Sequence, residues 1–177
     1  MLTDLSYTEQ EWADATEHRP LRALAPNELA LLHRHWMWAN QVREAFDATL
    51  SDPSDRVLDS PAMLASRTFG LLFVWYALLY VVVEASVDPK ELRNVDIRGR
   101  FRADIDSVCG VLRQCRNAVL HVPRSGEYID PRLESLVAQP DSAVTLRRVS
   151  IAFGRLFFDE FAHRGAHRAP DIDAPAG

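Results

Sequence analysis

The sequence predicts an all-α fold, a bundle of four long helices in up-and-down order with short extra helices. Two observations predict it. Apolar residues recur every three to four positions in four long segments, and prolines stand at or near the ends of these segments. A chain of 177 residues is long enough to form one domain with a buried core.

Residues 1–26 should form an N-terminal arm. The run Ser6-Tyr7-Thr8-Glu9 has the pattern of a capping box, so we expect a short helix near residues 7–16. The first long helix should then run from about residue 27 to residue 50. Its apolar residues recur at helical spacing: Leu32, Trp36, Ala39, Val42, Phe46 and Leu50.

The second long helix should run from about residue 61 to residue 87, because Ser60 suits the N-cap and Pro61 suits the first helical position. A helix that is apolar on all sides cannot leave a wide face in water. Either this helix is central within one subunit, or a second subunit covers part of it. Its middle carries Phe69, Leu72, Phe73, Trp75, Tyr76, Leu79, Tyr80 and Val83.

The same helix contains an uncharged run, from Phe69 to Val83, of fifteen residues. A membrane-spanning helix needs about 20 apolar residues. Arg67 and Glu84 flank the run. We therefore expect a buried helix of a soluble protein and no association with a membrane.

The third helix should follow a connection at residues 88–104 that holds at most one helical turn. It should run from about Asp104 to Val122, where Pro123 stops it. Its apolar stripe consists of Ile105, Val108, Cys109, Leu112, Cys115, Val119 and Val122.

The C-terminal part should add a short helix at about residues 131–138 and a last long helix at about residues 142–164. Val149, Phe153, Leu156, Phe157 and Phe161 should face the core. The helical domain then spans residues 27–164. The tail at residues 165–177 is rich in Ala, Pro and Gly and should be disordered.

The third helix ends in the motif Arg116-Asn117-Ala118-Val119-Leu120-His121. An imidazole can move protons near neutral pH, and a guanidinium can hold a phosphate through two parallel hydrogen bonds. An arginine and a histidine without accompanying metal ligands point to work on a phosphodiester. Arg116, Asn117 and His121 are therefore the candidate catalytic residues, and we expect neither a metal nor a cofactor.

Arg116 projects onto the edge of the apolar stripe at about 100° per residue. A buried arginine needs an anionic partner, and Glu84 is the best candidate in the chain; a phosphate is the external one. Three alternative interpretations stay open. The Arg116–Glu84 pair could only fix helix packing, His121 could have a purely electrostatic role at the helix end, and Asn117 could have a buried structural role.

This motif resembles the signature of the HEPN family of small helical domains, many of which are ribonucleases. That signature is an arginine, often a polar residue directly after it, and a histidine four to six residues beyond. Here these are Arg116, Asn117 and His121, with a gap of four. The resemblance covers roughly residues 27–164.

The resemblance implies a two-fold homodimer in which the two motif helices form a shared cleft. It also implies metal-independent RNA cleavage by the 2′-hydroxyl, with His121 as general acid or base, Arg116 stabilising the phosphate and Asn117 orienting it. A toxin or antiviral-defence effector, with an inhibitory or activating protein partner and RNA such as tRNA as target, fits this class. The alternative is a non-catalytic HEPN-like module that binds a nucleotide, RNA or a protein.

One departure from the family concerns control. In toxins that a nucleotidyltransferase antitoxin modifies, a tyrosine lies two residues after the histidine, whereas this chain has Pro123. That form of control is therefore not expected.

The charge distribution suits a local phosphate site. The net charge is −5, yet the stretch from residue 98 to residue 124 holds six arginines and two acids. Arg98, Arg100, Arg102 and Arg124 are candidate RNA-binding residues, and Arg113 and Glu84 are candidate supporting residues. The alternative for Arg98, Arg100 and Arg102 is a solvated helix face.

Cysteine usage fits a cytoplasmic protein. Cys109 and Cys115 are six residues apart, which is neither a redox spacing nor a zinc spacing. Both should act as small buried residues. The first residues show no secretory signal pattern.

Overall fold

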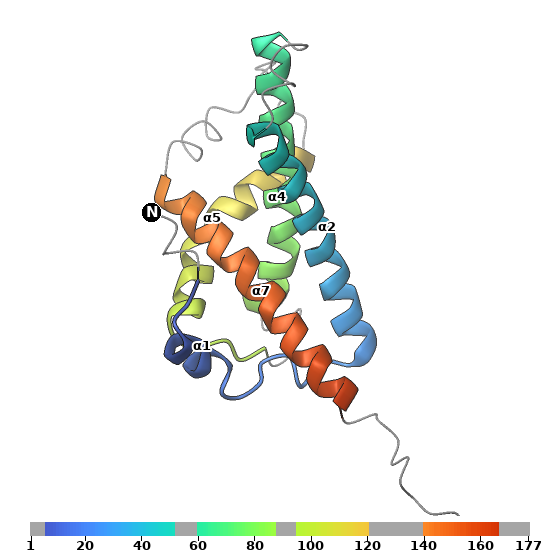
Figure 1. The fold of residues 1–177 in the computed structure, drawn as a ribbon, viewed down its shortest axis with the longest axis vertical. Coiled ribbons are helices and arrows are strands. Elements are labelled where there is room, and N and C mark those ends of the chain that lie inside the picture. The colour runs from blue at the N-terminus through green and yellow to red at the C-terminus, as the bar shows by residue number, and fades with distance from the viewer. Residues whose placement is uncertain (1–5, 52–59, 88–94, 121–139, 167–177) are drawn as a thin grey trace, which may run out of the picture.

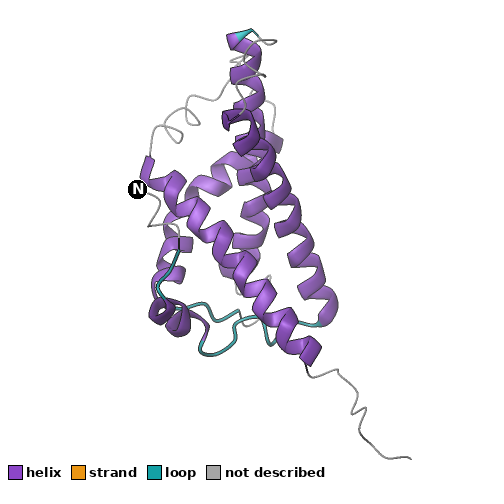
Figure 2. Ribbon diagram, viewed as in Figure 1, coloured by secondary structure: helices purple, strands orange, loops and turns teal. Residues whose placement is uncertain are grey.

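The computed structural model describes residues 6–51, 60–87, 95–120 and 140–166, and within them it forms five helices and no strand (Figure 2). The helices are α1 (Glu9–Thr16), α2 (Pro26–Ser51), α4 (Pro61–Val87), α5 (Gly99–Leu120) and α7 (Pro140–Ala166). The predicted all-α class is confirmed.

The four long helices alternate in direction along the chain (Figure 1). Helix α4 packs against α2 and α5, and α7 runs obliquely across α5 and α2. Helix α1 lies against the first half of α5. The up-and-down order predicted from the sequence is thus present in a single chain.

The starts of α1 and α5 differ from their predicted positions. The capping box of α1 uses Thr8 and Glu11 rather than the run that begins at Ser6: the Thr8 hydroxyl accepts the Glu11 N–H, and the Glu11 carboxylate accepts the Thr8 N–H. Helix α5 starts at Gly99, five residues before Asp104. Phe101, one turn before Ile105, is fully buried, so the apolar stripe begins earlier than expected.

The ends of α4 and α2 agree with prediction to within a residue, whereas α7 runs two residues further at each end. Gly165 therefore lies inside a helix and not in a disordered tail. The predicted helix at residues 131–138 and the end of the third helix at Val122 lie outside the described residues, as do residues 167–177.

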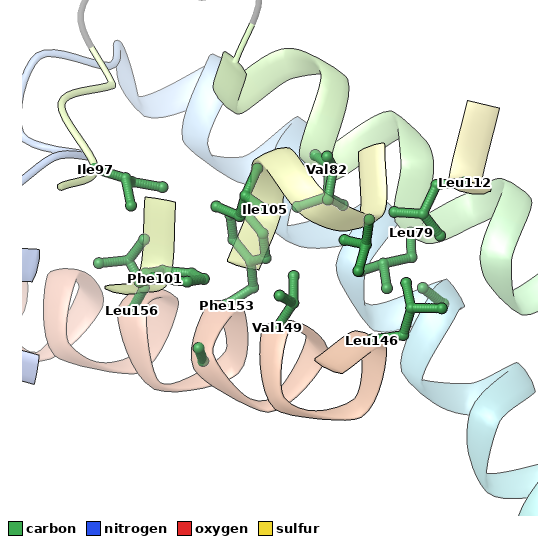
Figure 3. Close-up of a cluster of buried hydrophobic side chains, with 14 of the residues drawn as sticks. Leu79, Val82, Ile97, Phe101, Ile105, Leu112, Leu146, Val149, Phe153 and Leu156 are labelled. Atoms are coloured by element: carbon green, nitrogen blue, oxygen red, sulfur yellow. The ribbon is translucent and has the colours of Figure 1, made fainter. Parts of the chain in front are cut away.

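The core forms where α4, α5 and α7 meet (Figure 3). Each helix contributes a stripe of fully buried side chains, such as Leu79 from α4, Leu112 from α5 and Phe153 from α7. These side chains interdigitate between the helices, so burial of apolar area holds the bundle together.

Burial stops before the ends of some helices and leaves three residues of the predicted apolar faces exposed, including Phe161, which was expected to face the core. Val119 is 41% exposed, and Leu50 and Phe161 are also exposed. All three lie in the last two turns of their helices, where fewer neighbouring side chains remain to cover them. Phe161 still makes an edge-on contact with the His33 ring, with centroids 5.0 Å apart.

Helix α4 is only partly covered within one chain. Its second half is buried at Trp75, Leu79 and Val82, while Met63 and Val74 are exposed. The segment Met63–Ser86 is, among the described residues, the one long and apolar enough to cross a membrane by length and composition, a test that core helices of soluble proteins also pass.

The N-terminal arm is fastened to α5 and α7 by polar contacts. The Tyr7 hydroxyl donates to Asp104 Oδ2 at 2.7 Å, and the buried Arg148 donates to the same oxygen at 2.7 Å. On the surface, Arg100 pairs with Glu11 and Arg155 pairs with Glu9. The arm is therefore part of the folded unit.

Candidate functional site

Three side chains meet on the facing sides of α4 and α5, and we call Tyr80, Glu84 and Arg116 the Arg116 cluster. Arg116 Nη2 lies 3.6 Å from Glu84 Oε1. The Arg116 guanidinium carbon also lies 5.1 Å from the centroid of the Tyr80 ring. The Tyr80 hydroxyl donates to Glu84 Oε1 at 2.7 Å.

Helix geometry explains why these residues meet. Tyr80 and Glu84 are four residues apart and so share one face of α4. Side chains on a helix lean toward its N-terminus. Because α4 and α5 run in opposite directions, Glu84 and Arg116 lean toward each other and converge beside Tyr80.

Arg116 lies at a half-buried position, as the sequence predicts for the edge of the stripe. Its side chain is 33% exposed, and that of Glu84 is 39% exposed. A pair so open to water is worth little in stability. A nitrogen–oxygen distance of 3.6 Å is also longer than a hydrogen bond, so the contact with Glu84 leaves the guanidinium N–H donors that an anion can use.

The hydroxyl of Tyr80 is a stable hydrogen-bond donor. Burial, together with the hydrogen bond to Glu84, raises the pKa of Tyr80 above its usual value of 10.0. The phenol therefore stays protonated at neutral pH and keeps one Glu84 oxygen occupied. The Glu84 carboxylate that faces Arg116 therefore already accepts a hydrogen bond from Tyr80.

The other candidate residues near Arg116 are either exposed or outside the described residues. Asn117 and Arg113 are exposed on the last turns of α5, next to Arg116 in sequence. His121 and Arg124 lie outside the described residues. The structure thus brings Arg116 together with Glu84 and leaves Asn117 exposed within one chain.

The other predicted RNA-binding arginines lie near the opposite end of α5. Arg98 pairs with Asp96, Arg100 with Glu11 and Arg102 with Asp106. At a rise of about 1.5 Å per residue, Arg102 is roughly 21 Å along the helix from Arg116. The fold therefore does not gather these arginines around the motif.

The two cysteines differ in burial, although both were predicted to be buried. Cys115 is buried and Cys109 is half-buried. Burial raises the pKa of Cys115 to about 12 and raises that of Cys109 as well. Both thiols stay protonated at neutral pH, so neither is an activated nucleophile.

A cavity of about 270 Å³ lies between the start of α2 and the end of α4. Its lining residues are Glu28, Leu31, Leu32, His35, Val81, Glu84 and Ala85. Glu84 belongs to both this cavity and the Arg116 cluster. Sequence reasoning missed the cavity, since it arises only when two helices pack, but it could have found Tyr80 from the four-residue spacing to Glu84.

No group of three His, Cys, Asp or Glu side chains in the described ranges could hold a metal ion. Comparison with models of known protein families, with curated proteins and with solved structures finds no match to this chain.

Proposed function

We propose that this chain is a metal-independent endoribonuclease of the HEPN type. The observation that carries the proposal is the position of Arg116, whose guanidinium is held at the surface of α5 by Tyr80 and Glu84, directly before the exposed Asn117. His121 follows Arg116 by five positions in the sequence. This is the Arg-Asn-…-His order whose resemblance to HEPN ribonucleases is described above.

In the proposed reaction, His121 takes the proton of an RNA 2′-hydroxyl, and the 2′-oxygen forms a bond to the adjacent phosphorus. The bond from phosphorus to the 5′-oxygen breaks, and that oxygen receives a proton from an acid, for which a second copy of His121 is available in a dimer. The products are a 2′,3′-cyclic phosphate and a 5′-hydroxyl. DNA lacks the attacking group.

Arg116 stabilises the charge that grows on the phosphoryl oxygens, and Asn117 orients the phosphate. Arg113 adds positive charge on the same helix. The contact with Glu84 holds the guanidinium in place when no RNA is bound, and a phosphate competes with it because the Glu84 pair is long and half exposed.

The proposed active form is a two-fold dimer with one shared cleft. Val119, an apolar side chain exposed two positions after Asn117, supports an interface at this end of α5. Such a ribonuclease would act as a toxin or an antiviral-defence effector in the cytoplasm, under the control of a protein partner.

The alternative is a non-catalytic HEPN-like module. The pairing of Arg116 with Glu84 inside one chain favours it, since that pair also fits a role in helix packing alone.

The test incubates the purified protein with total RNA and with tRNA in excess EDTA. His121→Ala and Arg116→Ala should each abolish cleavage. The controls are His18→Ala and Arg22→Ala, which change residues outside the motif and should cleave as the wild type does. If the folded wild-type protein leaves both RNAs intact while it binds RNA or a partner, the non-catalytic alternative replaces the proposal.

A further inference from the structure

The cavity between α2 and α4 has walls of two kinds. Leu31, Leu32, Val81 and Ala85 supply apolar surface. Glu28, His35 and Glu84 supply the polar side chains. A concave site with an apolar lining and a few polar groups is the usual form of a small-molecule site.

The polar side chains in this lining offer hydrogen-bond acceptors. Glu28 Oε2 accepts the backbone N–H of Ala25 at 2.8 Å, and Glu84 Oε1 accepts the Tyr80 hydroxyl. His35 Nδ1 lies 2.9 Å from the Leu31 carbonyl oxygen, which can only accept, so Nδ1 carries the proton. In the neutral ring, Nε2 is then an acceptor as well.

This arrangement of acceptors favours a ligand that donates hydrogen bonds. Glu28 is exposed and the Glu84 side chain is 39% exposed, so both carboxylates can pair with a cation whose alkyl part covers the apolar wall. Anions are disfavoured by the two carboxylates. A neutral apolar ligand would offer no hydrogen-bond donor to Glu28, His35 or Glu84.

The size of the cavity limits the ligand. At about 270 Å³ it lies just below the range of about 300–1,000 Å³ that is usual for ligand sites. It therefore suits a small molecule with a short alkyl chain.

We propose that this cavity binds a small organic cation of the alkylammonium or alkylguanidinium class. The charged head lies between Glu28 and Glu84, and the alkyl part lies against Leu31, Leu32, Val81 and Ala85. This inference stands apart from the proposed ribonuclease activity, because it uses no RNA contact and neither His121 nor Asn117.

The site also connects to Arg116 through Glu84, which lines the cavity and pairs with Arg116. A bound cation and Arg116 then share one carboxylate. The contact between Arg116 and Glu84 should loosen when the cavity is filled.

The experiment measures binding of n-butylguanidinium to the full chain by isothermal titration calorimetry, without RNA. The matched neutral probe is n-butanol. We expect saturable binding of the cation and none of the alcohol. Glu28→Gln should weaken binding about tenfold or more, because it removes a charge-assisted contact. The amide oxygen can still accept the Ala25 N–H, so the helix start is kept.

Two further variants make the result decisive. Val81→Phe fills the cavity and should abolish binding, while Glu44→Gln, which changes another carboxylate of α2 outside the cavity, should leave it unchanged. The proposal is overturned if the wild type does not bind the cation, if n-butanol binds equally well, or if Glu28→Gln and Val81→Phe bind as tightly as the wild type. None of these outcomes bears on RNA cleavage.

Discussion

At the scale of single residues, the Arg116 cluster combines contacts of unequal strength. The hydrogen bond from Tyr80 to Glu84 is short, at 2.7 Å, whereas the ion pair from Arg116 to Glu84 is 3.6 Å long and half exposed. The aromatic ring of Tyr80 adds a cation–π contact. Tyr80 therefore fixes Glu84 firmly and Arg116 only loosely.

Replacement of Tyr80 separates the roles of its hydroxyl and its ring. Tyr80→Phe should lower the free energy of unfolding by about 0.5–1.5 kcal/mol, because it removes one hydrogen bond and keeps the ring under Arg116. Tyr80→Leu should cost more, since it also removes the aromatic contact. Urea unfolding followed by circular dichroism measures both. Equal losses for the two variants would show that the hydroxyl carries the whole effect.

At the scale of helices, α1 depends on charged contacts. The hydrogen bonds from the Arg100 side chain and from the Thr8 backbone lower the pKa of Glu11 to about 2, from its usual value of 4.5. A carboxyl whose pKa is lowered in the folded state contributes stability above its unfolded pKa, and that contribution disappears as the pH falls through the folded pKa.

Acidification should therefore loosen α1 in the window between these two pKa values, from 4.5 down to about 2. The urea midpoint of the wild type should fall more steeply in that window than the midpoint of Glu11→Gln, which has no carboxyl to titrate. Parallel curves for the two proteins would contradict the assigned role of Glu11.

The packing of α2 against α7 depends on a glycine. A Cβ atom on Gly154 would lie 2.5 Å from Trp36 Cζ2. The indole cannot move aside freely, because its Nε1–H donates to the Ser150 carbonyl at 2.8 Å. Gly154 thus allows a close approach that no other residue permits.

Two glycine-to-alanine changes test this close approach. Gly154→Ala should destabilise the protein by about 1–3 kcal/mol through overpacking. Gly110→Ala, in α5, meets no atom within 4 Å and should stabilise it by about 0.5–1 kcal/mol through helix propensity. Thermal unfolding of both variants gives the comparison, and shifts of the same sign would refute the packing argument.

The sequence predicts most of the helices and their bounds, but it does not predict the features that arise only when the helices pack together. Pro61 marks the start of α4, because a helix start depends on local rules. Helical projection places Arg116 at the edge of the apolar stripe, and Glu84 was expected as its partner because it is the acid at the end of the apolar run. The start of α5 was missed because Phe101 is buried by contacts with distant segments. The shared role of Glu84 was missed because the cavity needs α2 and α4 to be packed.

At the scale of the whole molecule, Arg116 lies near the C-terminal end of α5, and the N-terminal arm packs against the first half of the same helix. The exposed Val119, beside Asn117, and the exposed Met63 and Val74 of α4 are apolar surface that the described part of one chain leaves uncovered. The proposed dimer would cover surface of this kind near the motif. Its cleft would then hold two copies each of Arg116, Asn117 and His121.

The central claim is RNA cleavage by 2′-hydroxyl attack, and the chemistry of the product ends tests it most directly. RNA fragments made by the wild-type protein in EDTA should carry a 2′,3′-cyclic phosphate and a 5′-hydroxyl. An RNA with a 2′-deoxy sugar at the cleavage position should stay intact, and His121→Ala should yield no fragments. Fragments with a 5′-phosphate, or cleavage of the deoxy-substituted RNA, would contradict the account.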